Sequence, residues 1–390
     1  MEFEVWWLIG IPLFFGLGWM AARIDIKQLI SESRSLPQGY FKGLNFLLNE
    51  QPDKAIDAFI EIVKLDPETT ELHFALGNLF RRRGETERAI RMHQNLLLRP
   101  DLPQEQQLMA RFELGQDFLK AGLLDRAEEV FQELTETPYS MQARRALLEI
   151  FQREKEWRQA IIVAEALQNM GAGNCTRQIA QFYCELAEDE LVRPHLENAM
   201  PLLEKALDVD RMCTRATILI GDAYKSMGDL EKAIETWRRV EKQNIQHTVL
   251  IVRRLMEAYE AVERPEEGIG LLRAYLAEVS SIDMLDVLVK ATVKLYGAEA
   301  ANELVHEELR RTPTLLALDR LLEAKLLVVP PAVRQDISDI RTLIQRYAQK
   351  LSHYRCGRCG FEARQFYWQC PGCHAWESYP PKRVEEENFS

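Results

Sequence analysis

One spacing of small and large side chains recurs along this chain, and it constrains the fold more than any other feature. Within residues 70–100, Gly77 is followed by Phe80, by Ala89 and finally by Pro100. A small residue lets two helices approach closely, and an aromatic ring fills the space beside it. Proline ends the second helix because it cannot continue the backbone hydrogen-bond ladder. The spacing therefore predicts a helix–turn–helix unit.

A unit of this kind cannot bury its apolar face alone, so it must stack on neighbouring units. Recurrence at about 34 residues is typical of tetratricopeptide repeats. We predict an all-α fold in which about eight such repeats form a superhelical solenoid over residues 36–315. The other repeats are marked by Gly43, Ala55, Phe59, Gly115, Phe118, Ala127, Phe131, Ala160, Ala199, Gly221, Tyr224, Ala233, Trp237, Tyr259, Gly268 and Ala301. These positions specify the fold and say nothing about a ligand.

The inner face of such an array is lined by the first helix of each repeat, and this face usually carries the function. Side chains one turn apart on that face follow i, i+3 or i+4 spacing. In the second, third and sixth repeats the spacing selects Phe74, Asn78, Arg81, Phe112, Gln116, Leu119, Ile218, Asp222 and Lys225. Each residue alone is as well explained by packing or by solvation. As a set, they predict a groove that binds a peptide segment of a partner protein.

The N-terminus carries an uncharged stretch, Val5–Ala22, which would span about 27 Å as a helix. A bilayer core is about 30 Å thick, so this stretch is long enough to be a membrane anchor. A core helix would show a polar face, and a signal peptide would begin with basic residues, whereas Glu2 and Glu4 stand here. Arg23 and Lys27 follow the stretch. The positive-inside rule then predicts a single-pass anchor with the N-terminus on the far side of the membrane and a cytoplasmic body.

Four of the seven cysteines form two Cys-x2-Cys pairs, Cys356 with Cys359 and Cys370 with Cys373. Four thiolates suit tetrahedral coordination of one metal ion, and the spacing leaves both zinc and iron open. The odd number of cysteines and their clustering favour a reducing compartment over a disulfide framework. Glycines beside the pairs allow tight turns that aim N–H groups at sulfur, and nearby aromatic rings would shield the site. These residues are Gly357, Gly360, Gly372, Phe361, Tyr367, Trp368 and Trp376.

The segment between the repeats and the cysteines predicts two further helices, the second with an apolar stripe through Val333, Ile340 and Tyr347. This helix could cap the solenoid, lie against the metal module or pair with a partner helix, and capping is the more common role. The predicted domains are an anchor (1–23), a connector (24–35), the repeat array (36–315), capping helices (316–351), a rubredoxin-like metal domain (352–379) and a disordered, solvated tail (380–390).

Charge and motifs exclude several classes of function. The formal net charge is −11, and the arginines near the cysteines are offset by glutamates, so we do not expect a nucleic-acid partner. Phosphate-binding, dinucleotide-binding, nucleophile-elbow and zinc-protease motifs are all absent from the sequence. The nearest miss is His306-Glu307, where Arg310 stands in place of a second histidine. We therefore expect a binding protein without catalytic residues.

The order of anchor, repeats and cysteine pairs, with YRCGRCGF and YWQCPGCHAW near the end, resembles the family of lipopolysaccharide assembly protein B of Gram-negative bacteria. The resemblance covers essentially the whole chain. It implies a non-enzymatic regulator at the inner membrane that controls the level of lipopolysaccharide. The implied partners are the deacetylase that commits precursor to lipid A, a membrane-bound AAA+ metalloprotease that degrades it, and other inner-membrane lipopolysaccharide-assembly proteins. The metal-binding cysteines of the family correspond to Cys356, Cys359, Cys370 and Cys373.

Two other classes of function stay open on the sequence. A passive scaffold would gather the enzymes of lipopolysaccharide synthesis and transport without directing proteolysis. A redox or metal sensor would change its binding to a partner with the state of the metal at constant fold. A homo-oligomer is also compatible with the sequence.

Overall fold

The structure is a computed structural model that describes residues 42–387 apart from 44, 47, 50, 66–69 and 194–195. The predicted anchor Val5–Ala22 and the connector lie outside the described residues. Within the described part of the chain, no helix is both long and apolar enough to cross a membrane. The chain divides into two compact units, Met1–Ile150 and Phe151–Ser390, which we call unit 1 and unit 2.

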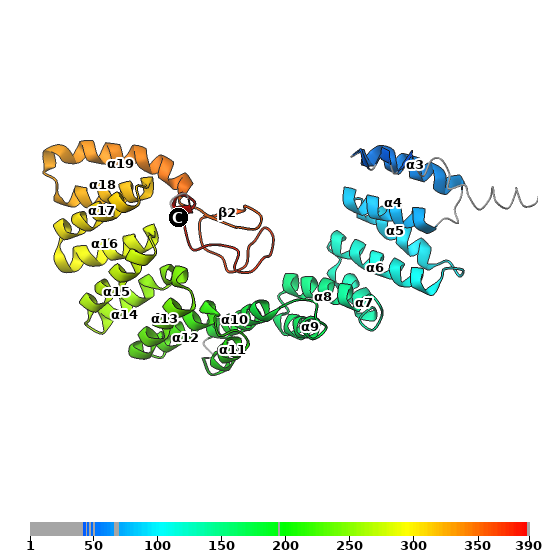
Figure 1. Cartoon of the computed structure of the whole chain (residues 1–390), viewed down its shortest axis with the longest axis horizontal. Helices are drawn as coiled ribbons and strands as arrows, with labels where there is room; N and C mark the ends of the chain where they lie inside the picture. Colours follow the sequence, from blue (N-terminus) through cyan, green and yellow to red (C-terminus); the bar gives the residue numbers. More distant parts are fainter. Residues whose placement is uncertain are drawn as a thin grey trace, which may run out of the picture. The chain divides into compact units, whose positions relative to one another are not determined.

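Unit 1 consists of helices that pack on one another in sequence order (Figure 1). They are α3 (Pro52–Leu65), α4 (Thr70–Arg83), α5 (Thr86–Leu97), α6 (Gln104–Ala121), α7 (Leu124–Glu133) and most of α8 (Ser140–Glu154). Gly122 ends α6 with a left-handed backbone (φ 77°), and its N–H bonds to the carbonyl of Leu119. Glycine adopts this conformation without a Cβ penalty, which is why the helix stops there.

Unit 2 continues the same architecture and ends in a small module with little regular structure. Its elements are α9 (Trp157–Asn169), α10 (Thr176–Val192), α11 (Leu196–Val209), α12 (Thr214–Ser226), α13 (Leu230–Gln243), η1 (Ile245–Leu250), α14 (Val252–Ala261), α15 (Pro265–Glu278), α16 (Ile282–Tyr296), α17 (Ala298–Arg311), α18 (Leu315–Val328), α19 (Pro331–Leu351), β1 (Tyr354–Arg355), β2 (Glu362–Ala363) and α20 (Val384–Glu387). The helical solenoid is thus confirmed, with one two-stranded sheet added to it.

The repeat pattern acts through one contact that recurs in the array. A Cβ atom on Gly115 would overlap the ring of Phe131, and a Cβ on Gly221 would overlap the indole of Trp237. Both rings are fully buried. A close approach of the two helices of a repeat therefore requires glycine on one helix and lets a large ring fill the space on the other.

Repeat two makes the same contact with a polar ring, since His93 lies against Gly77. His93 is fully buried, and its Nδ1 lies 2.5 Å from Oδ2 of the buried Asp117. Asp117 Oδ1 in turn accepts a hydrogen bond from Arg81 at 2.8 Å. The contact with Asp117 gives Nδ1 a partner, whereas the buried Nε2 has no hydrogen-bond partner among the described residues, so a histidine stands with one of its two ring nitrogens paired where other repeats place an aromatic ring.

The C-terminal tail differs from its prediction as a disordered, solvated end. Residues 380–386 pack within unit 2, and both Glu385 and Glu386 are buried. The acidic run suggested solvation, but each of these carboxylates accepts hydrogen bonds from a helix N-terminus. The prediction is therefore wrong for residues 380–387, and residues 388–390 lie outside the described part of the chain.

Candidate metal centre

The C-terminal module, which we call the ribbon (residues 354–380), presents two loops to each other. Strands β1 and β2 pair antiparallel, with Tyr354 opposite Ala363, and the loop between them carries the first cysteine pair. The second pair lies in a loop closed by an isolated bridge between Gln369 and Trp376. Two short loops of this kind can bring four side chains to one point without a large core.

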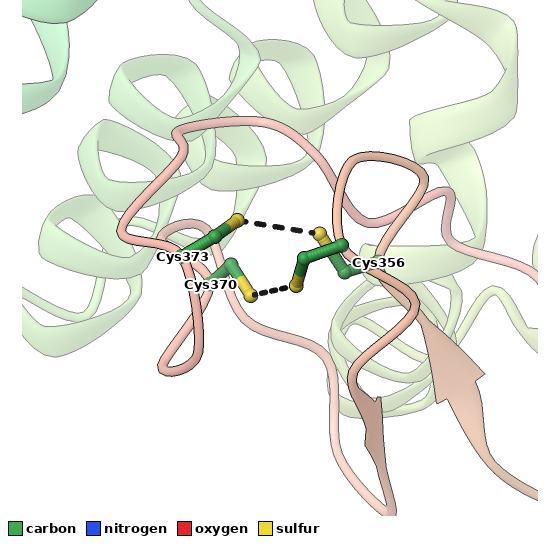
Figure 2. A group of neighbouring side chains, drawn as sticks. Cys356, Cys370 and Cys373 are labelled. Atoms are coloured by element: carbon green, nitrogen blue, oxygen red, sulfur yellow. Dashed lines mark hydrogen bonds between the residues drawn. The ribbon is translucent and has the colours of Figure 1, made fainter. Parts of the chain in front are cut away.

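The four sulfur atoms converge as a metal site requires (Figure 2). All four lie within 4.8 Å of one another, with Cys356 Sγ 3.8 Å from Cys373 Sγ and Cys359 Sγ 3.6 Å from Cys370 Sγ. Metal–sulfur bonds of about 2.3 Å in a tetrahedron place the ligand sulfurs about 3.8 Å apart. The predicted cysteines therefore form the site of one metal ion, and the sulfur donors accept either zinc or iron.

Backbone N–H groups are aimed at these sulfurs, as the turns in both loops predict. Gly372 donates to Cys370 Sγ at 3.4 Å, and the N–H groups of Arg358 and Cys359 donate to Cys356 Sγ. Donors of this kind stabilise the thiolate form that binds a metal. The loop backbone thus takes part in the site as well as the side chains.

The thiols do not ionise alike. Burial opposes ionisation of Cys356, but its hydrogen bond with Ser378 and those from the two backbone N–H groups outweigh it and lower the pKa of this thiol to about 6. At Cys359 the N–H of Phe361 favours the thiolate, yet desolvation and the other three thiols raise its pKa to about 12. Metal binding must therefore displace protons from the cluster, which makes its affinity depend on pH.

Of the aromatic residues predicted to shield the site, Tyr367 packs against the cluster that contains Cys356 and Cys370, whereas Phe361, Trp368 and Trp376 have other surroundings. Cys359 is exposed and Phe361 is 44% exposed, so the first loop of the site faces solvent. Tyr367 packs beside Tyr379 within the ribbon, with ring centroids 6.2 Å apart. Trp368 turns away to the helices of unit 2, where its ring meets that of His247 at 5.4 Å.

Trp376 attaches the ribbon to the first helices of unit 2. Its Nε1 donates to Gln152 at 3.0 Å, and its ring meets those of Trp157 and Phe182 at 6.1 and 5.9 Å. The Arg215 guanidinium lies 5.9 Å from the same ring. Figure 1 shows the ribbon on the inner side of the arc of unit 2 helices, where these contacts form.

Asp283 attaches the other end of the ribbon to α16. Its two oxygens accept hydrogen bonds from Nε and Nη2 of Arg383, both at 2.9 Å, and Oδ2 also accepts from the Tyr354 hydroxyl at 2.7 Å. The Arg383 guanidinium lies 4.1 Å from the Tyr354 ring. A bidentate Arg–carboxylate pair fixes orientation as well as distance.

The buried tail glutamates cap two helices. Glu386 accepts from the N–H of Ile282 at the start of α16 (2.5 Å), and Glu385 accepts from the N–H groups of Leu315 and Leu316 at the start of α18 (2.6 and 3.1 Å). These N–H groups have no partner within their own helix, and the helix dipole favours a carboxylate there. The tail therefore fastens the ribbon to the array.

Sequence reasoning missed this set of contacts. Asp283, Arg383, Glu385 and Glu386 belong to no motif, and the glutamate run Glu385–Glu387 predicts a solvated tail. One sign that α16 is capped from elsewhere is that its own N-cap residue, Ser281, makes no side-chain capping hydrogen bond. Such a gap becomes visible only once the helix boundary is known.

The predicted groove residues divide into two classes. Phe74, Leu119 and Ile218 are buried at 5–6% exposure in the interior of their units. They cannot line an open groove, so for these three the prediction is wrong, because a one-turn spacing does not distinguish the inner face from the seam between neighbouring repeats. Phe112 is half-buried and stacks on Tyr139, with centroids 5.3 Å apart.

The remaining polar groove residues mostly hold neighbouring repeats together. Arg81 bonds to Asn78 at 2.6 Å and pairs with Glu113 and Asp117 of α6. The other residues are Gln116, which is half-buried, Asp222, which pairs with Arg254 at 2.7 Å, and Lys225, which pairs with Glu257 at 2.7 Å. Lys225 is 40% exposed and so remains available to a partner. A role of this set in partner binding stays a prediction.

Comparison with known proteins agrees with both parts of the molecule. The family described as rubredoxin metal binding domain matches residues 354–380, and tetratricopeptide repeat families match residues 72–106 and 214–242. Among solved structures, a tetratricopeptide repeat protein from Parabacteroides merdae has a TM-score of 0.34 at 11% identity, covering 78% of this chain and all of that one.

Two curated relatives match along nearly the whole chain, and both are named lipopolysaccharide assembly protein B. The one from Escherichia coli K12 is 35% identical over 376 residues, covering 96% of this chain and 97% of the relative. The one from Haemophilus influenzae is 30% identical over 391 residues, covering 97% and 98%. The similarity therefore includes the repeat array and the four-cysteine ribbon together.

Proposed function

Because this chain belongs to the family of lipopolysaccharide assembly protein B, we propose that it is an inner-membrane adaptor that regulates lipopolysaccharide synthesis. In this proposal it brings the deacetylase that commits precursor to lipid A to a membrane-bound AAA+ protease, which degrades it. The observation that carries the proposal is the similarity along 96% of the chain to a protein named for lipopolysaccharide assembly. A repeat array of this kind suits a binding role without catalysis of its own.

The arrangement of unit 2 is consistent with an adaptor. The ribbon lies on the inner side of the unit 2 helices (Figure 1). Lys225 on α12 and Glu257 on α14, first helices of two neighbouring repeats, form an ion pair and are 40% and 54% exposed. We propose that this exposed part of the inner face binds one partner. The segment Val5–Ala22 would confine the array to the membrane plane, which raises its effective concentration near a membrane protease.

The half-life of the deacetylase tests the proposal against a passive scaffold. With the chain depleted from cells, we expect the deacetylase to persist several-fold longer, and an unchanged half-life would leave only the scaffold. Deletion of Val5–Ala22 should lengthen the half-life in the same way if tethering matters. Both measurements need the protein level and the helical content of the variant as controls.

A matched pair of lysines tests the inner face. Lys225 on α12 pairs with Glu257, and Lys232 on α13 pairs with Asp229, each at 2.7 Å and each exposed. Loss of an exposed ion pair costs at most about 1 kcal/mol, so Lys225→Ala and Lys232→Ala should be equally stable. Binding of a partner on the inner face predicts that Lys225→Ala alone reduces partner recovery from membranes. Equal recovery with both variants would count against it.

A further inference from the structure

The last helix of the array has two different faces. On one face, Ile344 and the buried Ala348 turn toward α18, and Arg341 bonds to Asp319 of α18 at 3.0 Å. Among the described elements α19 packs on α18, and Figure 1 shows it as the outermost helix of unit 2. The other face carries four large apolar side chains, Val333, Ile340, Leu343 and Tyr347, which are 45, 50, 58 and 67% exposed.

An exposed apolar stripe is unexpected at this position. The terminal helix of a repeat array normally presents a polar outer face, because no further repeat covers it. Here the apolar residues follow one another at steps of seven, three and four, which is the spacing of the seam between two paired helices. The outer face of α19 therefore has the pattern of a helix that is covered by another helix.

The charges beside the stripe indicate which helix this is. Asp336 and Asp339 lie in the first half of α19 together with Arg334, and Arg346 and Lys350 lie in the second half. Arg341, at the middle, is already paired with Asp319 and Glu323 of α18. In the described part of the chain, Asp336, Arg346 and Lys350 have no ion-pair partner within the 4.0 Å limit for such a pair. Asp336 and Lys350 each stand seven residues from Leu343, so a second α19 running antiparallel about Leu343 would place every acid near a base.

We propose that α19 pairs with α19 of a second copy of this chain, antiparallel about a two-fold axis at Leu343. The interface is isologous, with Leu343 meeting its own equivalent and Asp336 meeting Lys350 on both sides of the axis. A single helix pair makes a small interface, so we expect a dissociation constant on the order of micromolar. The proposal adds an assembly state to the proposed adaptor and does not depend on its client.

Disulfide trapping of the full-length chain in cells tests the geometry. Leu343→Cys places two thiols at the two-fold axis and should give a strong covalent dimer on oxidation. Thr342→Cys is the matched control, because the neighbouring side chain is also exposed but turned about 100° around the helix. Equal trapping of the two variants, trapping no higher than the background from the natural cysteines, or a product of monomer size would overturn the proposal.

Charge exchange tests the partner. Asp336→Lys with Asp339→Arg should weaken the dimer at least tenfold by sedimentation of the full chain, and adding Arg346→Asp with Lys350→Asp should restore it. The restored protein and the wild type are each self-complementary but repel one another, so mixed dimers should be rare. A wild type that is monomeric at tens of micromolar, or a dimer whose dissociation constant does not change with these charge substitutions, would refute the pairing. Deacetylase half-life is measured separately, so either proposal can fail alone.

Discussion

The repeat array is stabilised by contacts between residues close in sequence, whereas the ribbon is stabilised by contacts between residues far apart in sequence. In the array, Gly221 meets Trp237 within one repeat, and Gly115 meets Phe131 in the same way within another. In the ribbon, Arg383 reaches back to Asp283 and Trp376 reaches back to Gln152, while its own small core contains Tyr354, Tyr379 and cysteines. Local contacts nucleate anywhere along a solenoid, whereas contacts distant in sequence form only after the chain is ordered.

This difference teaches that the two regions should fail differently. An array built from repeated local contacts can keep its helices when one attachment is lost. The ribbon has too little apolar core to stand alone, so it depends on the metal and on the array at once. Each prediction below disturbs one region and asks whether the other responds.

The largest effect should follow loss of the metal site. Cys370→Ser with Cys373→Ser removes two of four ligands, and a structural metal contributes on the order of 10 kcal/mol to a small module. We expect the ribbon to lose its structure and Trp368 and Trp376 to become solvent-exposed, while the helical circular dichroism is largely kept. Metal content and tryptophan fluorescence measure this directly.

Cys175→Ser is the matched control, because this cysteine lies outside the ribbon and should leave one metal ion per chain. Chelation of the metal from the wild type should reproduce the effect of the double variant. Retention of the metal by the double variant would contradict the assignment. Collapse of the array helices together with the ribbon would contradict the contrast between the two regions.

A smaller effect is expected from a single methyl group inside the array. Gly221→Ala would force a Cβ against the indole of Trp237, which is fully buried and donates a hydrogen bond to the Ile218 carbonyl at 3.1 Å. Overpacking of this kind costs about 1–3 kcal/mol. Urea unfolding should therefore show a clear loss of stability.

Gly270→Ala provides the opposite outcome in the same kind of element. A Cβ at Gly270, within α15, meets no atom within 4 Å, so replacement by a better helix former should stabilise the protein by up to about 1 kcal/mol. Similar effects of the two substitutions would mean that helix propensity, and not the close approach at Gly221, decides the response.

The same contrast explains what could be predicted from the sequence. Gly77, Gly115 and Gly221 recur at regular positions in their repeats, so the repeats could be predicted from the sequence. The four cysteines are likewise regularly spaced, so the metal site could be predicted as well. His93 shows the limit, because its burial depends on Asp117 of the next repeat. Phe74 and Ile218 show it again, since their burial is set by how far neighbouring repeats overlap.

The attachment of the ribbon could not be predicted, because the residues that form it do not recur at a regular spacing in the sequence. Asp283 and Arg383 are 100 residues apart, and nothing in either neighbourhood indicates the other. Glu385 and Glu386 carry the sequence signal of a solvated tail, and only the positions of two helix N-termini reverse it. Long-range polar contacts of this kind are a property of the assembled fold.

The last predicted effect comes from one of these tail carboxylates and is a dependence of stability on pH. Burial raises the pKa of Glu386 from 4.5 to about 7, and the nearby charge of Asp283 raises it further. Hydrogen bonds from the N–H groups of Arg383 and Ile282 and the charge of Arg383 lower this pKa, but by less. Between these two pH values the folded protein holds a proton that the unfolded chain has released. Stability therefore falls as pH rises from about 5 to 8, by up to about 3 kcal/mol.

Glu386→Gln isolates this contribution, because the amide oxygen can still accept from Ile282 and carries no charge. We expect the free energy of unfolding of the variant, measured by tryptophan fluorescence, to rise relative to that of the wild type by up to about 3 kcal/mol between pH 5 and pH 8. Glu278→Gln, at an exposed carboxylate in α15, should change nothing in this comparison. Parallel pH profiles for wild type and Glu386→Gln would mean that Glu386 is ionised throughout. The tail would then fasten the ribbon as a charged helix cap, and the attachment would not respond to pH in this range.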